Sequence, residues 1–137
     1  MAKIAIKARL ILYHKGKILL LKQTKPNGGN YTLVGGTVES YETARDSLIR
    51  ESHEEAGIRL QAADLRLVHV LHKHKKKQTR IVLYFKGYRW QGELKARETK
   101  KFKEAEWFAL DNLPTNLTST VRHVLDEYRQ GILYSEM

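Results

Sequence analysis

The stretch GTVESYETARDSLIRESHEEAGI, residues 36–58, has the pattern of one amphipathic helix. Ser40 is the expected N-cap, and Glu42 falls in the first turn, where the helix dipole favours an acid. Gly57 suits the position just past the last turn. Apolar residues recur at helical spacing at Ala44, Leu48, Ile49 and Ala56. The stretch therefore predicts a helix between Ser40 and Gly57.

Three acids, Glu51, Glu54 and Glu55, crowd the C-terminal end of this helix and share one face by their spacing. Like charges at this spacing repel by about 0.2–0.5 kcal/mol per pair, and the helix dipole costs each acid a further ~0.3–1 kcal/mol. Arg50 can pair with Glu54 and offset part of this. A divalent cation would resolve the conflict, since Mg²⁺ takes carboxylate oxygens together with water and phosphate oxygens. A solvated helix face rich in a good helix former explains the acids equally well from the helix alone.

The wider spacing of the charged residues resembles the Nudix box, G-x5-E-x7-R-E-U-x-E-E-x-G-U, in which U is a bulky aliphatic residue. Ser52 stands at the one aliphatic position that departs from the pattern. Upstream, YTLVGGTVE resembles the family's W-x-L-P-G-G-x-x-E, and downstream, EWFALDNLP resembles the strand and turn of MutT-type members. The resemblance covers residues 4–130. The box positions are filled by Gly36, Glu42, Arg50, Glu51, Glu54, Glu55, Gly57 and Ile58.

This resemblance implies the Nudix fold, an α+β fold with a mixed β-sheet sandwiched between α-helices. It also implies that the box forms a loop-helix-loop that holds Mg²⁺, with Mn²⁺ as a substitute. In the family, the glutamates that match Glu51, Glu54 and Glu55 bind the metal, often with the backbone carbonyl that matches Gly36. Glycine at that position lets the backbone approach an ion closely.

Two box residues are expected to support the site without binding metal. Glu42 lies about 180° from Glu51 on an ideal helix, so it cannot join the metal face directly. Its role in the family as a structural partner of the residue that matches Arg50 fits this position better.

Glu98 lies in KARETKKF, residues 95–102, where many family members place an additional acidic ligand or a general base. Glu54, Glu55 and Glu98 are therefore the candidate catalytic residues. A solvated loop acid is the plain alternative for Glu98. Other acids in the same region are Glu93, Glu104 and Glu106.

The rest of the chain reads as strands and one further helix, in a single domain over residues 1–137. Alternating apolar residues over 3–13 predict a strand with one buried face, and YTLV predicts a short strand broken by Gly35 and Gly36. The lysine tract that follows residue 73 predicts a hairpin tip. The other predicted strands are 18–22, 65–73, 79–90 and 104–110, and the second helix is 117–129.

The chain carries 25 Lys and Arg against 15 Asp and Glu, a net charge of +10. Such a balance attracts anions, including nucleotides and nucleic acids, although a basic surface without a dedicated partner explains it as well. Individually weak candidates for phosphate contacts are Arg9, Lys22, Arg80 and Lys100. Aromatic residues that can stack on a base, but in strands are more often core residues, are Tyr31, Tyr84, Phe102 and Trp107.

The absence of cysteine excludes a disulfide framework and a thiolate metal site. The apolar run near the start of the sequence is too short for a membrane span and is broken by Lys7 and Arg9. We therefore expect no signal peptide, no membrane partner and a cytoplasmic location.

The resemblance implies Mg²⁺-dependent hydrolysis of a diphosphate linkage in a nucleotide or a nucleoside-diphosphate derivative. Nucleoside triphosphates, ADP-ribose and capped RNA remain open as substrates, with RNA the less favoured partner. The alternative class is a non-catalytic Nudix-like module that binds a nucleotide or RNA. Such a module is expected to have lost box carboxylates, and none is lost here. Homodimers are frequent in the family, but the sequence carries no interface signature.

Overall fold

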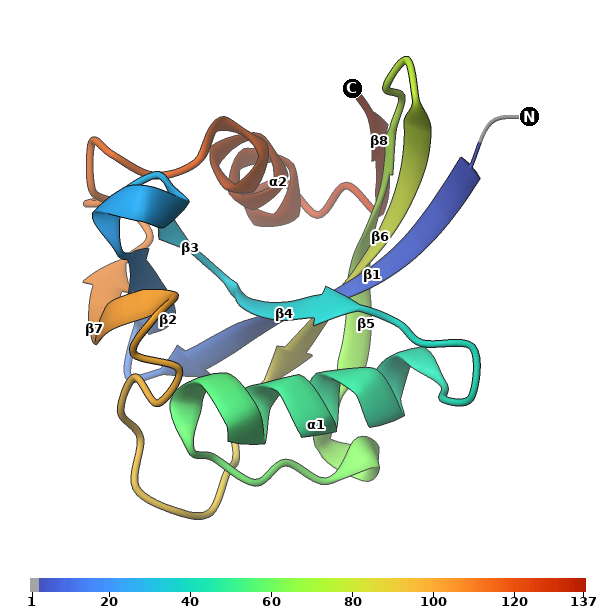
Figure 1. Cartoon of the computed structure of the whole chain (residues 1–137). Helices are drawn as coiled ribbons and strands as arrows, with labels where there is room; N and C mark the ends of the chain where they lie inside the picture. Colours follow the sequence, from blue (N-terminus) through green and yellow to red (C-terminus); the bar gives the residue numbers. More distant parts are fainter. Residues whose placement is uncertain (1–2) are drawn as a thin grey trace.

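The computed structural model describes residues 3–137 and shows a mixed β-sheet with one α-helix on each side (Figure 1). The helices are α1 (Ala44–Ala56) and α2 (Ser119–Arg129), with short 3-10 turns at Lys25–Asn27 and Ala62–Asp64. The strands are β1 (Lys3–His14), β2 (Lys17–Gln23), β3 (Tyr31–Thr32), β4 (Val34–Thr37), β5 (Arg66–Lys73), β6 (Gln78–Gly87), β7 (Phe102–Ala109) and β8 (Tyr134–Glu136). The expected fold class is confirmed.

Strand β1 lies at the centre of the sheet, whose order is β3-β2-β1-β6-β5-β8. Along one edge β1 pairs in parallel with β6. Along the other edge it pairs antiparallel with β4 and, only at its last two residues, with β2. Strand β7 continues the sheet from β2. On this edge of β1 the sheet therefore divides into two strands, β2 and β4, and β4 lies close to α1.

Gly35 and Gly36 lie inside β4, where they pair with Arg9 and Ala8, so the expected break at these glycines is wrong. Gly35 has a φ of +140°, and a Cβ there would lie 2.1 Å from the carbonyl oxygen of Ala8. Only glycine allows this close approach of the two strands. The two glycines thus let β4 pair closely with β1 on the side of the sheet that faces α1.

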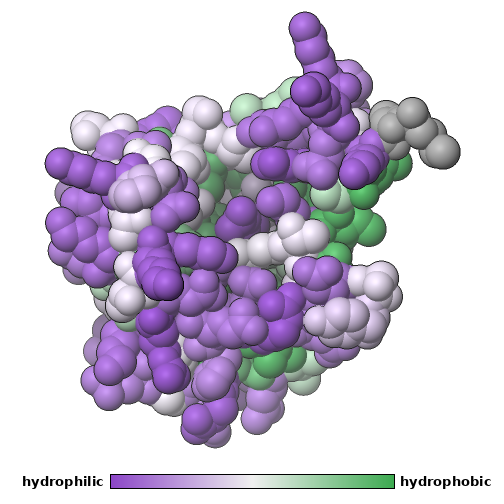
Figure 2. All heavy atoms as spheres, in the orientation of Figure 1, coloured by the Kyte–Doolittle hydropathy of each residue, from purple (hydrophilic) through white to green (hydrophobic). Residues whose placement is uncertain are grey.

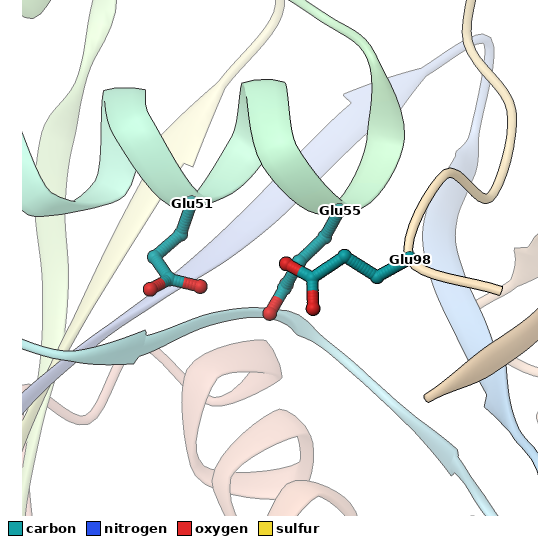
Figure 3. A group of neighbouring side chains, drawn as sticks. All are labelled: Glu51, Glu55 and Glu98. Atoms are coloured by element: carbon teal, nitrogen blue, oxygen red, sulfur yellow. The ribbon is translucent and has the colours of Figure 1, made fainter. Parts of the chain in front are cut away.

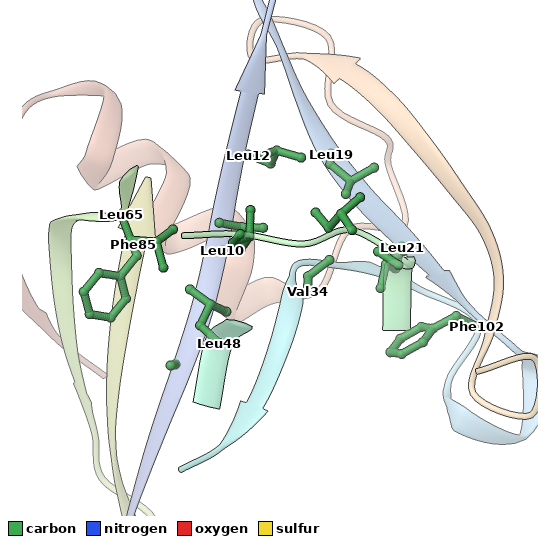
Figure 4. Close-up of a cluster of buried hydrophobic side chains, with 13 residues drawn as sticks. Leu10, Leu12, Leu19, Leu21, Val34, Leu48, Leu65, Phe85 and Phe102 are labelled. Atoms are coloured by element: carbon green, nitrogen blue, oxygen red, sulfur yellow. The ribbon is translucent and has the colours of Figure 1, made fainter. Parts of the chain in front are cut away.

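Apolar side chains fill both spaces between the sheet and the helices. Figure 4 shows the cluster on the α1 side, where Leu48 meets Leu10 of β1. On the α2 side, Ile11 packs in a cluster with Val124. The expectation of a single buried face on β1 is therefore wrong for its second half, because a helix covers each face there. Near the start of the strand, Ile4 remains 70% exposed.

Helix α1 begins at Ala44, so Ser40 is not its N-cap and Glu42 lies before the helix. Thr43 is the N-cap, and its hydroxyl accepts from the backbone N–H of Asp46 at 3.2 Å. The Asp46 carboxylate accepts in return from the Thr43 N–H at 3.4 Å. This capping box satisfies two N–H groups at once, which the expected cap does not do.

The lysine tract forms the β5–β6 turn at residues 74–77, as expected. Strand β8 was not expected; it pairs in parallel with β5. The second helix starts two residues later than predicted. Within residues 3–137, no helix is both long and apolar enough to cross a membrane.

Candidate metal-dependent active site

Three carboxylates converge where the C-terminal half of α1 faces β4 (Figure 3). Glu51 and Glu55 project from α1 and Glu98 from the loop before β7. One oxygen of each carboxylate lies within 4.8 Å of the others. Glu51 also lies against Gly36, since a Cβ built on Gly36 would be 3.0 Å from the Glu51 carboxylate carbon. An oxygen-only donor set of this kind matches a hard divalent cation such as Mg²⁺.

Glu55 is the most deeply buried of the three, with 3% of its surface exposed. Its Oε1 accepts from the backbone N–H of Gly35 at 3.0 Å. Burial raises the pKa of Glu55 to about 8, and the neighbouring Glu51 carboxylate adds to the shift, against the opposing Gly35 N–H. A buried acid with one N–H partner and an acidic neighbour is stabilised by a cation. The residues present therefore fit a divalent metal.

Arg50 connects the loop before α1 with the acids on the helix. Its Nη2 lies 2.7 Å from Glu42 Oε1, and its Nη1 donates to Glu51 Oε1 at 2.9 Å. The Arg50 guanidinium, helped by the Glu39 N–H, holds the pKa of Glu42 at about 2. The ion pair expected for the Glu42 and Arg50 positions is thus present, and Arg50 also orients Glu51.

Glu54 lies outside the carboxylate group, although the sequence places it among the metal ligands. Its Oε2 is 3.4 Å from Arg50 Nη1, and its side chain is 46% exposed. Consecutive residues on a helix are about 100° apart, so Glu54 and Glu55 flank Glu51 on opposite sides. The structure brings together Glu51, Glu55 and Glu98 and leaves Glu54 beside Arg50.

Backbone hydrogen bonds to the end of α1 hold the Glu98 loop in place. The N–H of Arg97 donates to the carbonyl of Glu55 at 2.9 Å, and the N–H of Lys95 donates to that of Ala56 at 3.1 Å. These bonds satisfy carbonyls that a helix end leaves free. Glu98 itself pairs with Lys101 at 3.3 Å. The helix end thus positions both the loop and the third carboxylate.

Glu51 and Glu55 border a cleft of about 420 Å³ that also contains cations. Lys7, Arg9 and Lys101 line it together with Glu51 and Glu55. Figure 2 shows hydrophilic side chains gathered over this face of the molecule. The cleft thus places negative and positive groups side by side, as a complex of a metal ion with a phosphate requires.

Arg9 and Lys7 reach the cleft from β1. The Arg9 guanidinium donates to the carbonyls of Leu33 at 3.3 Å and Gly35 at 3.1 Å. Burial lowers the pKa of Lys7 to about 8, and the nearby Arg80 and Arg9 charges add to the shift. Lys7 therefore lies in a positive environment.

Sequence reasoning found Arg9 but missed Lys7 and Lys101 as cleft residues. Strand alternation could have found Lys7, because it shares a face of β1 with Arg9. Lys22 instead lies over the Tyr31 ring, 5.7 Å from its centroid. Of the expected aromatic residues, Tyr31, Tyr84 and Phe102 are buried.

Comparison with known families gives one match over most of the chain. The model of the NUDIX domain matches residues 4–128. Among solved structures, the MutT NUDIX hydrolase from Burkholderia pseudomallei is similar, with a TM-score of 0.82 and 28% identity over 90% of this chain and 97% of that one. The MutT protein from Methanosarcina mazei Go1 has the same fold, with a TM-score of 0.80 at 20% identity.

Two curated relatives are longer than this chain. The chain is 36% identical over 105 residues to the ADP-ribose pyrophosphatase of Methanocaldococcus jannaschii, covering 76% of this chain and 61% of that protein. It is 27% identical over 122 residues to the NAD-capped RNA hydrolase NudC of Pseudomonas aeruginosa strain PAO1, covering 87% of this chain and 42% of that protein. The chain thus spans less than two thirds of either relative.

Proposed function

The chain belongs to the Nudix family, and we propose that it is a pyrophosphohydrolase that uses Mg²⁺, or Mn²⁺ in its place. Its substrate would be a nucleotide or a nucleoside-diphosphate derivative, cleaved at a diphosphate linkage. The observation that carries this proposal is the convergence of Glu51, Glu55 and Glu98. The first two of these acids line a cleft together with Lys7 and Arg9.

In this proposal Glu51 and Glu55 hold the cation, and they are joined by the carbonyl of Gly36, a residue that lies against the Glu51 carboxylate. Glu54 is proposed as a further ligand: it would leave its contact with Arg50 to reach the cation, and Arg50 would still pair with Glu42 and Glu51. When bound, the cation neutralises phosphate charge and makes water more acidic.

The remaining groups bind the substrate and move a proton. Lys7, Arg9 and Lys101 contact the phosphate oxygens and offset the charge that develops during cleavage. Glu98 has a side chain that is 28% exposed, whereas Glu55 is almost fully buried. We therefore assign to Glu98 the removal of a proton from the attacking water.

The relatives suggest which substrates to test first. The archaeal relative is named an ADP-ribose pyrophosphatase and the bacterial one an NAD-capped RNA hydrolase, so ADP-ribose and NAD-capped RNA join nucleoside triphosphates in the test. A non-catalytic binding module is less favoured, because every box carboxylate is present. A cytoplasmic location and a homodimer remain predictions.

The test is a screen of these substrates with Mg²⁺ and with excess EDTA, with the products identified. We expect metal-dependent cleavage within the diphosphate. Glu98→Gln should lower kcat and flatten its pH dependence, whereas Asp126→Asn, at an exposed position on α2, should match the parent. Cleavage at the parent rate in excess EDTA, or no cleavage of any substrate with metal, would contradict the proposal.

A further inference from the structure

A second cavity, of about 180 Å³, adjoins the cleft on the α2 side of the sheet. Lys7 and Arg9 line both spaces, so the two are continuous at these residues. Lys73 and Arg80 line only the second cavity. None of the proposed catalytic steps uses these last two cations.

Strand register brings the four cations to one face of the sheet. Lys7 and Arg9 are two residues apart on β1 and therefore point to the same side. On β6, the residues that pair with Lys7 and Arg9 are 82 and 84. Arg80 lies two residues before residue 82 and therefore points to the same side of the sheet. Lys73 of β5 pairs directly with Arg80. The cluster is thus built from three neighbouring strands.

The cavity collects positive charge and, within residues 3–137, has no acid in its own lining, although Glu51 and Glu55 of the adjoining cleft lie near Lys7 and Arg9. Of the described residues, no Asp or Glu lines it, and none of the four cations takes part in an ion pair. Lys73 Nζ donates to Thr120 Oγ1 at 2.5 Å, and Arg80 Nε donates to Gln78 Oε1 at 3.2 Å. These neutral partners orient the cations but do not neutralise them. An anion in the cavity would relieve their mutual repulsion.

The N-terminus of α2 adds to the positive potential. Thr118, Thr120 and Val121 of this end line the cavity. The N-cap, Thr118, makes no side-chain hydrogen bond to the first turn, and that turn contains no acid. Helix N-termini with free N–H groups favour anions, and phosphate groups in particular.

We propose that this cavity binds a phosphate group of the substrate that is not part of the cleaved diphosphate. The substrate class is then a small diphosphate compound that carries a further phosphate ester. This inference rests on the proposed function, because the cleft must hold the diphosphate. At about 180 Å³ the cavity is less than half the size of the adjoining cleft, which suits one phosphate group rather than a whole nucleotide.

The experiment compares two pairs of compounds that differ by one phosphate: ADP-ribose with 2′-phospho-ADP-ribose, and dephospho-coenzyme A with coenzyme A. Equilibrium binding is measured in EDTA, so that it depends on neither metal nor turnover. In at least one pair the compound with the extra phosphate should bind about tenfold tighter or more, which is ~1.4 kcal/mol. The double variant Lys73→Gln/Arg80→Gln should lose this preference and keep its affinity for the partner compound.

The matched control, Lys17→Gln/Arg66→Gln, removes two exposed cations that line neither space, and it should keep the preference. Equal affinity within both pairs, or a preference that survives Lys73→Gln/Arg80→Gln, would overturn the proposal. Single-stranded RNA that binds more tightly than either phosphorylated compound, with that binding lost in the double variant, would overturn the assignment to a small molecule.

Hydrolysis of the same compounds with Mg²⁺ is followed separately. Absence of turnover with the binding preference intact would count against the proposed function alone, and turnover without the preference would count against the cavity alone.

Discussion

The two faces of the central sheet differ in the charge they collect and in how they hold it. The α1 face gathers Glu51 and Glu55, and Arg50 and a backbone N–H provide their partners. The α2 face gathers Lys73 and Arg80, whose partners are neutral oxygens. Arg9 of β1 lines the spaces on both sides.

This difference indicates that the two sides of the sheet bind groups of opposite charge. The acids lie close together, so a cation would relieve their repulsion, and the bases lie close together, so an anion would relieve theirs. A metal ion with a phosphorylated substrate would meet both needs at once, because the metal ion would lie against the acids and the phosphates against the bases. Each side can therefore be tested by removing its charge without changing the other side.

The largest effect is expected from the acidic side. Glu55→Gln should lower kcat/KM by a factor of about 100 or more, because it removes a buried ligand charge. Glu54→Gln should cost less, about tenfold, because Glu54 lies beside Arg50 in the absence of metal. The measurement is steady-state hydrolysis of the best substrate, with folding checked by circular dichroism. Equal activity of the parent and Glu55→Gln would remove the acidic side from the mechanism.

A pH titration of stability without metal should show the strain on the acidic side. The pKa of Glu55 is about 8 in the folded protein against 4.5 for the ordinary group. The unfolded chain therefore loses this proton first as the pH rises. The contribution of Glu55 to stability should be full below about pH 4.5 and should fall by a few kcal/mol as the pH approaches 8.

Urea unfolding in EDTA at several pH values measures this dependence. Glu55→Gln should flatten it, since no carboxylate remains to ionise at this position. A parent protein whose stability rises between pH 5 and 8 would show that Glu55 is ionised without cost.

A smaller effect is expected from Ser52, which is fully buried on α1. Among the described residues, its hydroxyl is the only buried side-chain polar atom without a hydrogen-bond partner. Ser52→Ala should stabilise the protein by about 1 kcal/mol, since it removes an unpaired hydroxyl and alanine favours a helix. Thermal unfolding measures the gain. A loss of stability would mean that the hydroxyl is paired after all.

The smallest effect is expected from the β5–β6 turn on the basic side. Lys75 lies near enough to Lys7 and Lys73 to lower their pKa, but the turn lysines line neither space. Replacing Lys75, Lys76 and Lys77 with serine should change kcat/KM for a mononucleotide by less than about threefold at moderate salt, where exposed charges are screened. Loss of cleavage would mean that the turn takes part in binding a small substrate.

Local patterns in the sequence predicted the box helix and grouped Glu51, Glu54 and Glu55 on one face, and the structure brings together only Glu51 and Glu55 of these three. They misplaced the N-cap, because Ser40 and Thr43 are both suitable caps and only the Thr-x-x-Asp pairing with Asp46 distinguishes them. The contact of Glu54 with Arg50 left it outside the group, and helical spacing already indicates why, because it places Glu54 and Glu55 on opposite sides of Glu51.

The basic cavity could not be predicted from local patterns. It needs β1, β6 and β5 side by side in a defined register, and residues 7 and 80 meet only through that long-range pairing. Strand β8 was missed because three residues are too few to show a period. The basic cavity and β8 thus both depend on pairing between strands that are far apart along the chain.

The most direct test of the central claim, that the acids on α1 hold a divalent cation, is thermal unfolding at pH 8 with EDTA and with Mg²⁺. At a hundredfold excess over Kd, Mg²⁺ should stabilise the parent by about 2.7 kcal/mol, which raises Tm on the order of 5–10 °C. In EDTA, Glu55→Gln should melt at or above the parent, and its response to Mg²⁺ should nearly vanish. Asp126→Asn should respond like the parent. An unchanged parent Tm in Mg²⁺ and in Mn²⁺, or a full response in Glu55→Gln, would contradict the claim.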